Sequence, residues 1–382
     1  MYGEGPTAGS VFRIRTGLIV SALVLLAAVT ACARVTQPTG WPGGVVSGDA
    51  LLIGSRDGEL IALDRETGAF LWRQELPRDD DPQAIYGTPA VFDGTVVAAG
   101  YDGRLYAFDA LDGSPQWTEQ VGAEGFPIVG APLVSGGTVL VGSSDGNFYA
   151  LRTEDGSEIW RFSTGNKIWS TPTVADGIVY FGSLDKFVYA LWITDGSELW
   201  RFQAGGSVTA APVVVGGRVY VGAFDGIFYA VDAQTGIEVW RFDETGSWFW
   251  ASAVAAEGAI YAPNMDGHLY ALDLRTGDRL WKLETEGSIV SSPVIVGDKI
   301  AVASDDGRLR IVRRADGFTA GQCNIGGKLR APLAESDGVV FFGAPDNSIR
   351  ALSIKTNGNP DEKWVFFTDK EDQSAASRVA AC

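Results

Sequence analysis

The stretches DGIFYAVDAQTGIEVW (225–240) and DGHLYALDLRTGDRLW (266–281) decide the fold of this 382-residue chain. Each stretch contains an Asp-Gly turn, a short apolar strand, a Thr-Gly turn and a second strand that ends on Trp. Gly and Asp are typical of tight hairpins, because Gly adopts positive φ freely and Asp tolerates it. The pattern therefore predicts antiparallel strands and almost no helix.

The same phrase recurs eight times, at intervals of 40 to 45 residues. A period of this size indicates a repeated unit, here of four short strands. One such sheet cannot bury both faces alone, whereas eight sheets packed around an axis can. We therefore predict an all-β, eight-bladed β-propeller of four-stranded antiparallel blades over residues 41–368. The Asp that opens each turn is Asp57, Asp102, Asp145, Asp185, Asp225, Asp266, Asp306 or Asp346.

Seven units carry a Trp at the same place in the predicted fourth strand, where a large ring would pack between blades. The seventh unit has Cys323 near the expected place. We expect Cys323 to be a small buried apolar residue, and we do not expect a disulfide between it and Cys382. The Trp residues are Trp72, Trp117, Trp160, Trp200, Trp240, Trp281 and Trp364.

The two stretches quoted above resemble the repeat of the PQQ-like propeller superfamily. That superfamily includes quinoprotein alcohol dehydrogenases and the outer-membrane assembly lipoprotein BamB. The resemblance covers nearly all of the chain after residue 40, and it implies the propeller fold. It does not by itself imply a bound quinone, because one fold serves many functions.

The first 31 residues have the pattern of a signal peptide. Arg13 and Arg15 precede an apolar run over 17–31, which is shorter than the ~20 residues of a membrane span. Val-Thr-Ala-Cys at 29–32 resembles a bacterial lipobox, and this resemblance implies cleavage before Cys32 and acylation of that residue. The alternative is an ordinary signal peptide with an incidental cysteine.

The remaining segments outside the repeats are short and polar. We expect residues 32–40 to be the lipidated cysteine and a tether, and residues 369–382 to be a disordered tail. Acylation at Cys32 would anchor the propeller to the cell envelope. In a cell with an outer membrane, we expect it on the periplasmic face of that membrane, and otherwise on the cell surface.

Charge and composition exclude several functions. The net charge is −17 and no block of Lys or Arg exists, so nucleic acid is a poor partner. His268 is the single histidine, which excludes a His-dependent triad or a multi-His metal site. The run Asp79 to Asp81 does not match a calcium loop. The recurrent turn Asp residues are expected to accept backbone N–H bonds, and we expect a monomer that is not an enzyme.

A PQQ-dependent dehydrogenase remains an alternative because of the resemblance. Such enzymes carry an adjacent Cys pair, a Glu–Asn–Asp calcium set and a Trp beneath the quinone. This chain has no adjacent Cys pair, and its residues give no calcium set. Trp169, Trp248 or Trp250 offers a ring and Lys328 or Arg330 a charge, but this is not a matching site. We therefore expect no cofactor and no metal.

Aromatic residues that the repeat does not require gather in two sets of loops. These are the link into the first strand of a unit and the loop between its second and third strands, which should open on one rim. The alternative is that the rings plug the channel or pack between blades. The candidate binding rim is Trp41, Tyr86, Tyr101, Phe126, Trp169, Phe224, Trp248, Phe249, Trp250, Met265, Lys328 and Arg330.

Exposed aromatic rings with Met and Arg are typical of protein-binding hot spots. We therefore expect a non-catalytic, lipid-anchored scaffold that resembles BamB and binds envelope or membrane proteins by its rim or its strand edges. A receptor for a small molecule or glycan in the central funnel is the alternative, because Trp faces also stack on ligand rings.

Overall fold

A computed structural model describes residues 42–77, 84–368 and 382. All of them belong to one compact unit, Thr39–Cys382, and the other unit is Met1–Pro38. Several predictions therefore lie outside the described residues. They concern the signal peptide, Cys32 and its tether, Trp41, Asp79 to Asp81 and the tail residues 369–381.

The described residues form eight four-stranded antiparallel sheets, which confirms the predicted propeller. Each sheet keeps its four strands in chain order, so each blade is one repeat. Blades 1 to 4 comprise β1 (Gly44–Ser47), β2 (Ala50–Gly54), β3 (Glu59–Asp64), β4 (Phe70–Glu75), β5 (Ala90–Phe92), β6 (Thr95–Ala99), β7 (Arg104–Asp109), β8 (Pro115–Gln120), β9 (Leu133–Ser135), β10 (Thr138–Gly142), β11 (Asn147–Arg152), β12 (Glu158–Ser163), β13 (Thr173–Ala175), β14 (Ile178–Gly182), β15 (Phe187–Trp192) and β16 (Glu198–Gln203).

Blades 5 to 8 follow the same plan. They comprise β17 (Val213–Val215), β18 (Arg218–Gly222), β19 (Phe228–Asp232), β20 (Glu238–Phe242), β21 (Val254–Ala256), β22 (Ala259–Pro263), β23 (His268–Asp273), β24 (Arg279–Glu284), β25 (Val294–Val296), β26 (Lys299–Ala303), β27 (Arg308–Arg313), β28 (Thr319–Asn324), β29 (Ala334–Ser336), β30 (Val339–Ala344), β31 (Ser348–Ile354) and β32 (Pro360–Phe367). The described ranges contain no helix.

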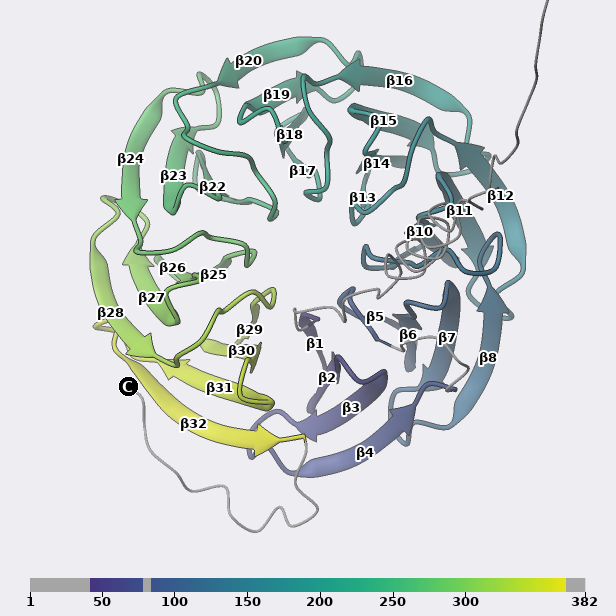
Figure 1. Cartoon of the computed structure of the whole chain (residues 1–382), viewed down its shortest axis with the longest axis horizontal. Coiled ribbons are helices and arrows are strands. Elements are labelled where there is room, and N and C mark those ends of the chain that lie inside the picture. Colours follow the sequence, from purple (N-terminus) through teal and green to yellow (C-terminus); the bar gives the residue numbers. More distant parts are fainter. Residues whose placement is uncertain (1–41, 78–83, 369–381) are drawn as a thin grey trace, which may run out of the picture. The chain divides into compact units, whose positions relative to one another are not determined.

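The first strand of each blade lies near the axis and the fourth lies on the outside (Figure 1). The second and third strands are almost wholly buried, and the fourth strands alternate between buried and exposed side chains. The apolar core is therefore divided into eight clusters, each between two neighbouring blades. Burial of these faces supplies the main driving force for closing the ring.

The fourth-strand Trp residues pack between blades as predicted. Trp200 is 8% exposed, and its indole Nε1–H donates to the Ala233 carbonyl of the next blade at 2.9 Å. Its ring lies on Gly236, where φ is +71° and an added Cβ would come within 2.8 Å of the ring. The Thr-Gly turn therefore needs Gly both for its backbone conformation and for the close approach of the Trp. The same indole-to-carbonyl bond recurs at Trp72, Trp117, Trp160, Trp240, Trp281 and Trp364.

Blade 7 breaks the Trp series at Gly321, so the prediction that Cys323 takes the Trp place was wrong. Ala271 pairs with Trp281 in blade 6, and the equivalent Ile311 pairs with Gly321 in blade 7. A Cβ at Gly321 would lie 2.4 Å from the carbonyl oxygen of Gly358. The missing ring thus lets the turn before β32 approach the backbone of blade 7.

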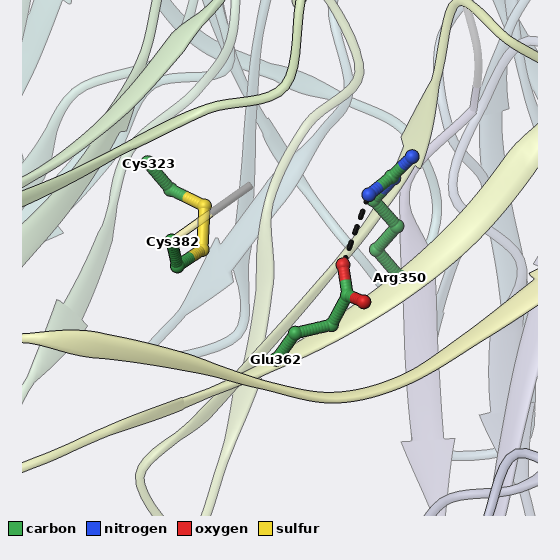
Figure 2. The surroundings of a disulfide bond; sticks show 4 residues. All are labelled: Cys323, Arg350, Glu362 and Cys382. Carbon is green, nitrogen blue, oxygen red and sulfur yellow. Dashed lines mark hydrogen bonds and ion pairs between the residues drawn. A yellow bond between two sulfur atoms is a disulfide. The ribbon is translucent and has the colours of Figure 1, made fainter. Parts of the chain in front are cut away.

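Cys323 is fully buried, as expected for a small apolar residue, but it is not a free thiol. It forms a disulfide with Cys382, which corrects the expectation that these residues stay unpaired (Figure 2). The sequence did not predict the bond, because 59 residues separate the two cysteines and the repeat does not place a residue beyond its last strand.

Seven of the eight turn Asp residues accept a backbone bond, as predicted. Asp57 is the exception, because the equivalent N–H, of Glu59, donates to Ser55 Oγ at 3.0 Å. In blade 5 the Ile227 N–H donates to Asp225 Oδ1 at 3.0 Å, and the Gly205 N–H of the preceding link donates to Oδ2 at 2.8 Å. The Tyr229 hydroxyl also donates to Oδ2, at 2.6 Å. Burial and this carboxylate raise the pKa of Tyr229 to about 12, so the hydroxyl remains a donor at neutral pH. The same Tyr–Asp bond recurs in blades 2, 3, 4 and 6.

Blades 7 and 8 replace this Tyr by Arg. Arg310 pairs with Asp306 at 2.5 Å, and both side chains are more than nine-tenths buried. Burial alone would raise the pKa of Asp306, but hydrogen bonds from Arg310, Ser304 and the Arg308 backbone outweigh it and lower that pKa to about 2. In blade 8 the guanidinium of Arg350 bonds both Asp346 and Glu362. In blades 7 and 8 a buried ion pair thus replaces the neutral Tyr–Asp hydrogen bond of the other blades.

Candidate binding rim

The two predicted sets of loops do lie against each other at one end of the ring. In blades 2 to 7 the residue before the turn Asp donates its backbone N–H to a carbonyl of the link into the first strand. Phe224 donates to Ser207 at 2.9 Å and Met265 donates to Trp248 at 3.1 Å. Tyr101, Ser144, Leu184 and Asp305 make the equivalent bonds. The described candidate residues therefore come from loops at one end of the ring, although their side chains do not all share one environment.

Four rings from the links and loops of blades 4 to 6 form a continuous surface, which we call the aromatic arc: Trp169, Phe224, Trp248 and Trp250. The Phe224 ring lies 5.0 Å from Trp248 and 5.6 Å from Trp250, between ring centroids. Trp248 is 44% exposed and Trp250 is 38% exposed. These two rings are therefore open to solvent.

Trp169 extends the arc across a small residue of the intervening blade. Its ring centroid lies 6.5 Å from that of Trp250, with the planes inclined at 58°. Thr209 occupies the equivalent position between them and is 9% exposed. The Trp169 indole donates to Ser144 Oγ at 3.0 Å, and the Lys167 ammonium lies 5.9 Å from its ring centroid. These contacts fix the ring while leaving one face of the arc uncovered.

The loop of blade 7 and the link into blade 8 are charged at the equivalent positions. Arg330 makes two hydrogen bonds to Asp305, at 2.9 and 2.7 Å, and Lys328 lies 3.8 Å from the same carboxylate. The hydrogen bonds from Arg330 to Asp305 raise the pKa of Arg330 above its usual value. We call Asp305, Lys328 and Arg330 the charged arc. The Arg330 guanidinium is bonded to Asp305, whereas the Lys328 side chain is 66% exposed.

The other predicted rim residues do not add a ring to the aromatic arc. Tyr86 and Tyr101 form their own pair, with centroids 5.2 Å apart, and burial raises the pKa of Tyr86. Phe126 is 41% exposed. Met265 is partly buried beside the Trp248 backbone. Aromatic rings thus lie at several places on the rim, but only in the aromatic arc do four rings contact one another in series.

Phe249 does not belong to the rim, which corrects its place in the prediction. It is fully buried and its ring packs 5.3 Å from Phe228, between centroids. The reason is strand alternation, because neighbouring side chains point to opposite sides of the backbone. Trp248 and Trp250 face the rim, and Phe249 therefore faces the core.

The described residues offer no set of three or more His, Cys, Asp or Glu that could hold a metal ion. His268 begins β23, and its Nδ1 lies 3.2 Å from Asp266 Oδ1 of the preceding turn. Among the described rim residues, the Asp305 carboxylate and the Arg330 guanidinium bond to each other. Within the same ranges no helix is long and apolar enough to cross a membrane.

The fold and the rim define a PQQ-like eight-bladed propeller with an open aromatic surface. Comparison with protein families is more specific. Matches over residues 15–167, 153–285, 247–331 and 266–381 place the chain in the family described as outer membrane protein assembly factor BamB. The chain therefore belongs to that family.

Individual relatives come from both branches of the superfamily. BamB of Moranella endobia (strain PCIT) is 32% identical over 81 residues, 19% of this chain and 20% of that protein. The quinohemoprotein alcohol dehydrogenase ADH IIB of Pseudomonas putida is 36% identical over 81 residues, 20% of this chain and 12% of that protein. The chain thus matches no more than about a fifth of the length of these relatives.

Solved structures are similar over most of the propeller. BamB from Moraxella catarrhalis aligns with a TM-score of 0.70 at 20% identity, over 81% of this chain and 95% of that one. A europium-containing methanol dehydrogenase aligns with a TM-score of 0.66 at 16% identity, over 81% of each chain. At such identities the likeness concerns the fold alone, and both an assembly factor and an enzyme share it.

Proposed function

We propose that this chain is a non-catalytic scaffold, anchored to the cell envelope through Cys32, whose aromatic arc binds a segment of a partner protein. The exposed aromatic arc is the observation that carries the proposal. Joined rings of this kind bury much area at a low cost in side-chain entropy, and they are typical of the centres of protein interfaces. Membership of the BamB family supports a partner from the outer-membrane assembly machinery.

The absence of a catalytic role is also part of the proposal. Of the rim residues, Arg330 is neutralised by Asp305, and seven of the eight turn carboxylates accept bonds from a Tyr or Arg side chain and from the backbone. A group that already bonds within the fold is poorly placed for acid–base or nucleophilic work. These contacts favour binding over catalysis.

The partner-binding claim is tested by affinity capture of the full-length protein from membranes. Trp248→Ala/Trp250→Ala should reduce recovery of the partner at least tenfold. Trp192→Ala is the matched control: Trp192 is 41% exposed but ends β15, at the opposite end of the ring. Equal recovery with both variants would contradict the proposal.

The anchor is tested separately. Cys32→Ser should release the protein from the membrane fraction, and mass spectrometry of the wild-type N-terminus should show an acylated Cys32. Retention of the Cys32→Ser protein in membranes, or an unmodified Cys32, would contradict the anchor but not the binding surface.

A receptor for a small molecule or glycan is the second candidate, favoured by Trp169 and Trp250 on either side of Thr209. Planar ring faces separated by a small residue suit stacking of a sugar. A rise in melting temperature with oligosaccharides that is lost in Trp169→Ala would support this candidate. The absence of any shift would leave the scaffold as the better account.

A further inference from the structure

The ring closes without sharing strands between its first and last blades. All four strands of blade 1 come from residues 44–75, and all four strands of blade 8 come from residues 334–367. The seam between them depends on side-chain contacts. Trp364 donates to the Arg65 carbonyl at 2.9 Å, and the Phe70 and Phe366 rings stack at 6.4 Å between centroids. Blade 8 is therefore held only by contacts with its two neighbours and by its links to the rest of the chain.

The other neighbour of blade 8 is blade 7, and that interface lacks the Trp found in all the others. Its apolar cluster contains Cys323, Ile311 and Leu352 but no Trp, whereas each of the seven other interfaces includes one. The disulfide starts from this same cluster, at the fully buried Cys323 of β28. The missing ring and the covalent bond thus occur at one interface.

We propose that the Cys323–Cys382 disulfide is a redox-dependent latch that holds blade 8 in the closed ring. The bond joins β28 of blade 7 to a residue beyond β32, so the whole of blade 8 lies inside the covalent loop. In Figure 1 the end marked C lies next to β28, in agreement with the disulfide. The latch takes over the role that a wedged Trp has at the other interfaces. This proposal is independent of the binding function of the rim.

The chemistry of the latch is that of thiol–disulfide exchange. Closing it removes one S–H hydrogen from each cysteine and forms one S–S bond. The two electrons pass to the disulfide of a thiol oxidoreductase, which becomes a dithiol as it takes up two protons. Opening it requires a dithiol reductant and reverses these steps. Cys382 is exposed while Cys323 is buried, so the mixed disulfide with the reductant forms at Cys382.

Peptide mapping and hydrogen exchange of the full-length protein test the latch. Under non-reducing conditions, mapping should recover a peptide containing Cys323 bound to one containing Cys382. Reduction of the folded wild type with a phosphine should then speed amide exchange in β29 to β32 at least tenfold and leave β13 to β20 within twofold. Reoxidation should restore protection.

A variant provides an independent measurement on the same protein. Cys382→Ser should reproduce the fast exchange of blade 8, and it should not respond to reductant or oxidant. The proposal is overturned if the wild type contains free thiols at both positions, or if either cysteine is paired with Cys32. It is also overturned if reduction changes exchange equally in all blades or in none.

Discussion

Blades 4 to 6 and blades 7 to 8 are built from one repeat, but they differ at three equivalent places. The first group has a Trp wedge at every interface, a Tyr on every turn Asp and rings at the rim. The second group has Gly321 in one Trp place, Arg310 and Arg350 on the turn Asp residues, and the charged arc at the rim. The repeat therefore tolerates a complete change of chemistry at positions that keep their geometry.

The difference shows which features the fold requires. A buried Asp carboxylate needs a donor, and either a phenol or a guanidinium satisfies it. An interface needs its space filled, and either an indole or a closer backbone does so. The side chains at the rim are needed neither as donors to a buried Asp nor to fill an interface. The aromatic arc of blades 4 to 6 is therefore the difference that points to function.

The largest effect on stability is expected at a Trp wedge. Trp200→Ala removes a ring that is 8% exposed and leaves a cavity between blades 4 and 5. It should lower the free energy of unfolding by about 3–5 kcal/mol in urea titrations. Trp192→Ala on the exposed end of β15 should cost less than about 1 kcal/mol. Equal losses would show that the interface Trp is not a wedge.

The next effect is expected at the donor to the turn Asp. Arg310→Met leaves the Asp306 carboxylate buried without its ion partner and should cost about 3 kcal/mol. Tyr270→Phe in blade 6 removes a neutral donor and should cost about 1 kcal/mol. Urea unfolding of both variants measures the contrast. A smaller loss for the Arg variant would show that the pair is not needed in blade 7.

Gly321 should be less tolerant of a side chain than its place in a β-strand suggests. A Cβ there would lie 2.4 Å from the Gly358 carbonyl, so Gly321→Ala should destabilise the protein by about 1–3 kcal/mol. Gly48→Ala at an open turn is the matched control for backbone strain alone. A stabilised Gly321→Ala protein would contradict the close approach of the two blades.

Acid should weaken blade 7 through Asp306. Its pKa is about 2 in the folded state, below the usual value near 4, so the stability that it contributes is present above about pH 4 and is lost as pH falls toward 2. The expected loss is about 1–2 kcal/mol, measured by urea unfolding at pH 5 and pH 2.5. Arg310→Tyr, which restores the donor of the other blades, should lose less over this interval. An equal loss would assign the acid sensitivity to other carboxylates.

The sequence predicted the fold because the turn Asp recurs in eight units and the fourth-strand Trp in seven of them. It failed where one unit departs from the pattern. Cys323 was assigned to the Trp place, since nothing local distinguishes it from Gly321 two residues earlier. The disulfide joins Cys323 to a residue beyond the last repeat, which the repeat pattern does not place.

The rim was predicted in part for the same reason. Strand alternation separated Phe249 from Trp248 and Trp250, but only the structure shows that Phe249 is buried and that Phe224 joins the two Trp rings. The partner of Arg330 was not predicted either, because Asp305 lies 25 residues earlier. Contacts between loops of different units depend on how the blades are placed, and a repeat pattern does not give that placement.

Site-specific photo-crosslinking in cells tests most directly whether the aromatic arc, and not the charged arc, is the docking surface. A benzophenone side chain is placed at Trp248 in one protein and at Lys328 in another, with Trp192 as the control position. We expect position 248 to crosslink a single membrane or envelope protein at least fivefold more efficiently than position 328, and position 192 to give none. Equal crosslinking at 248 and 328, or a product only at 328, would contradict the account.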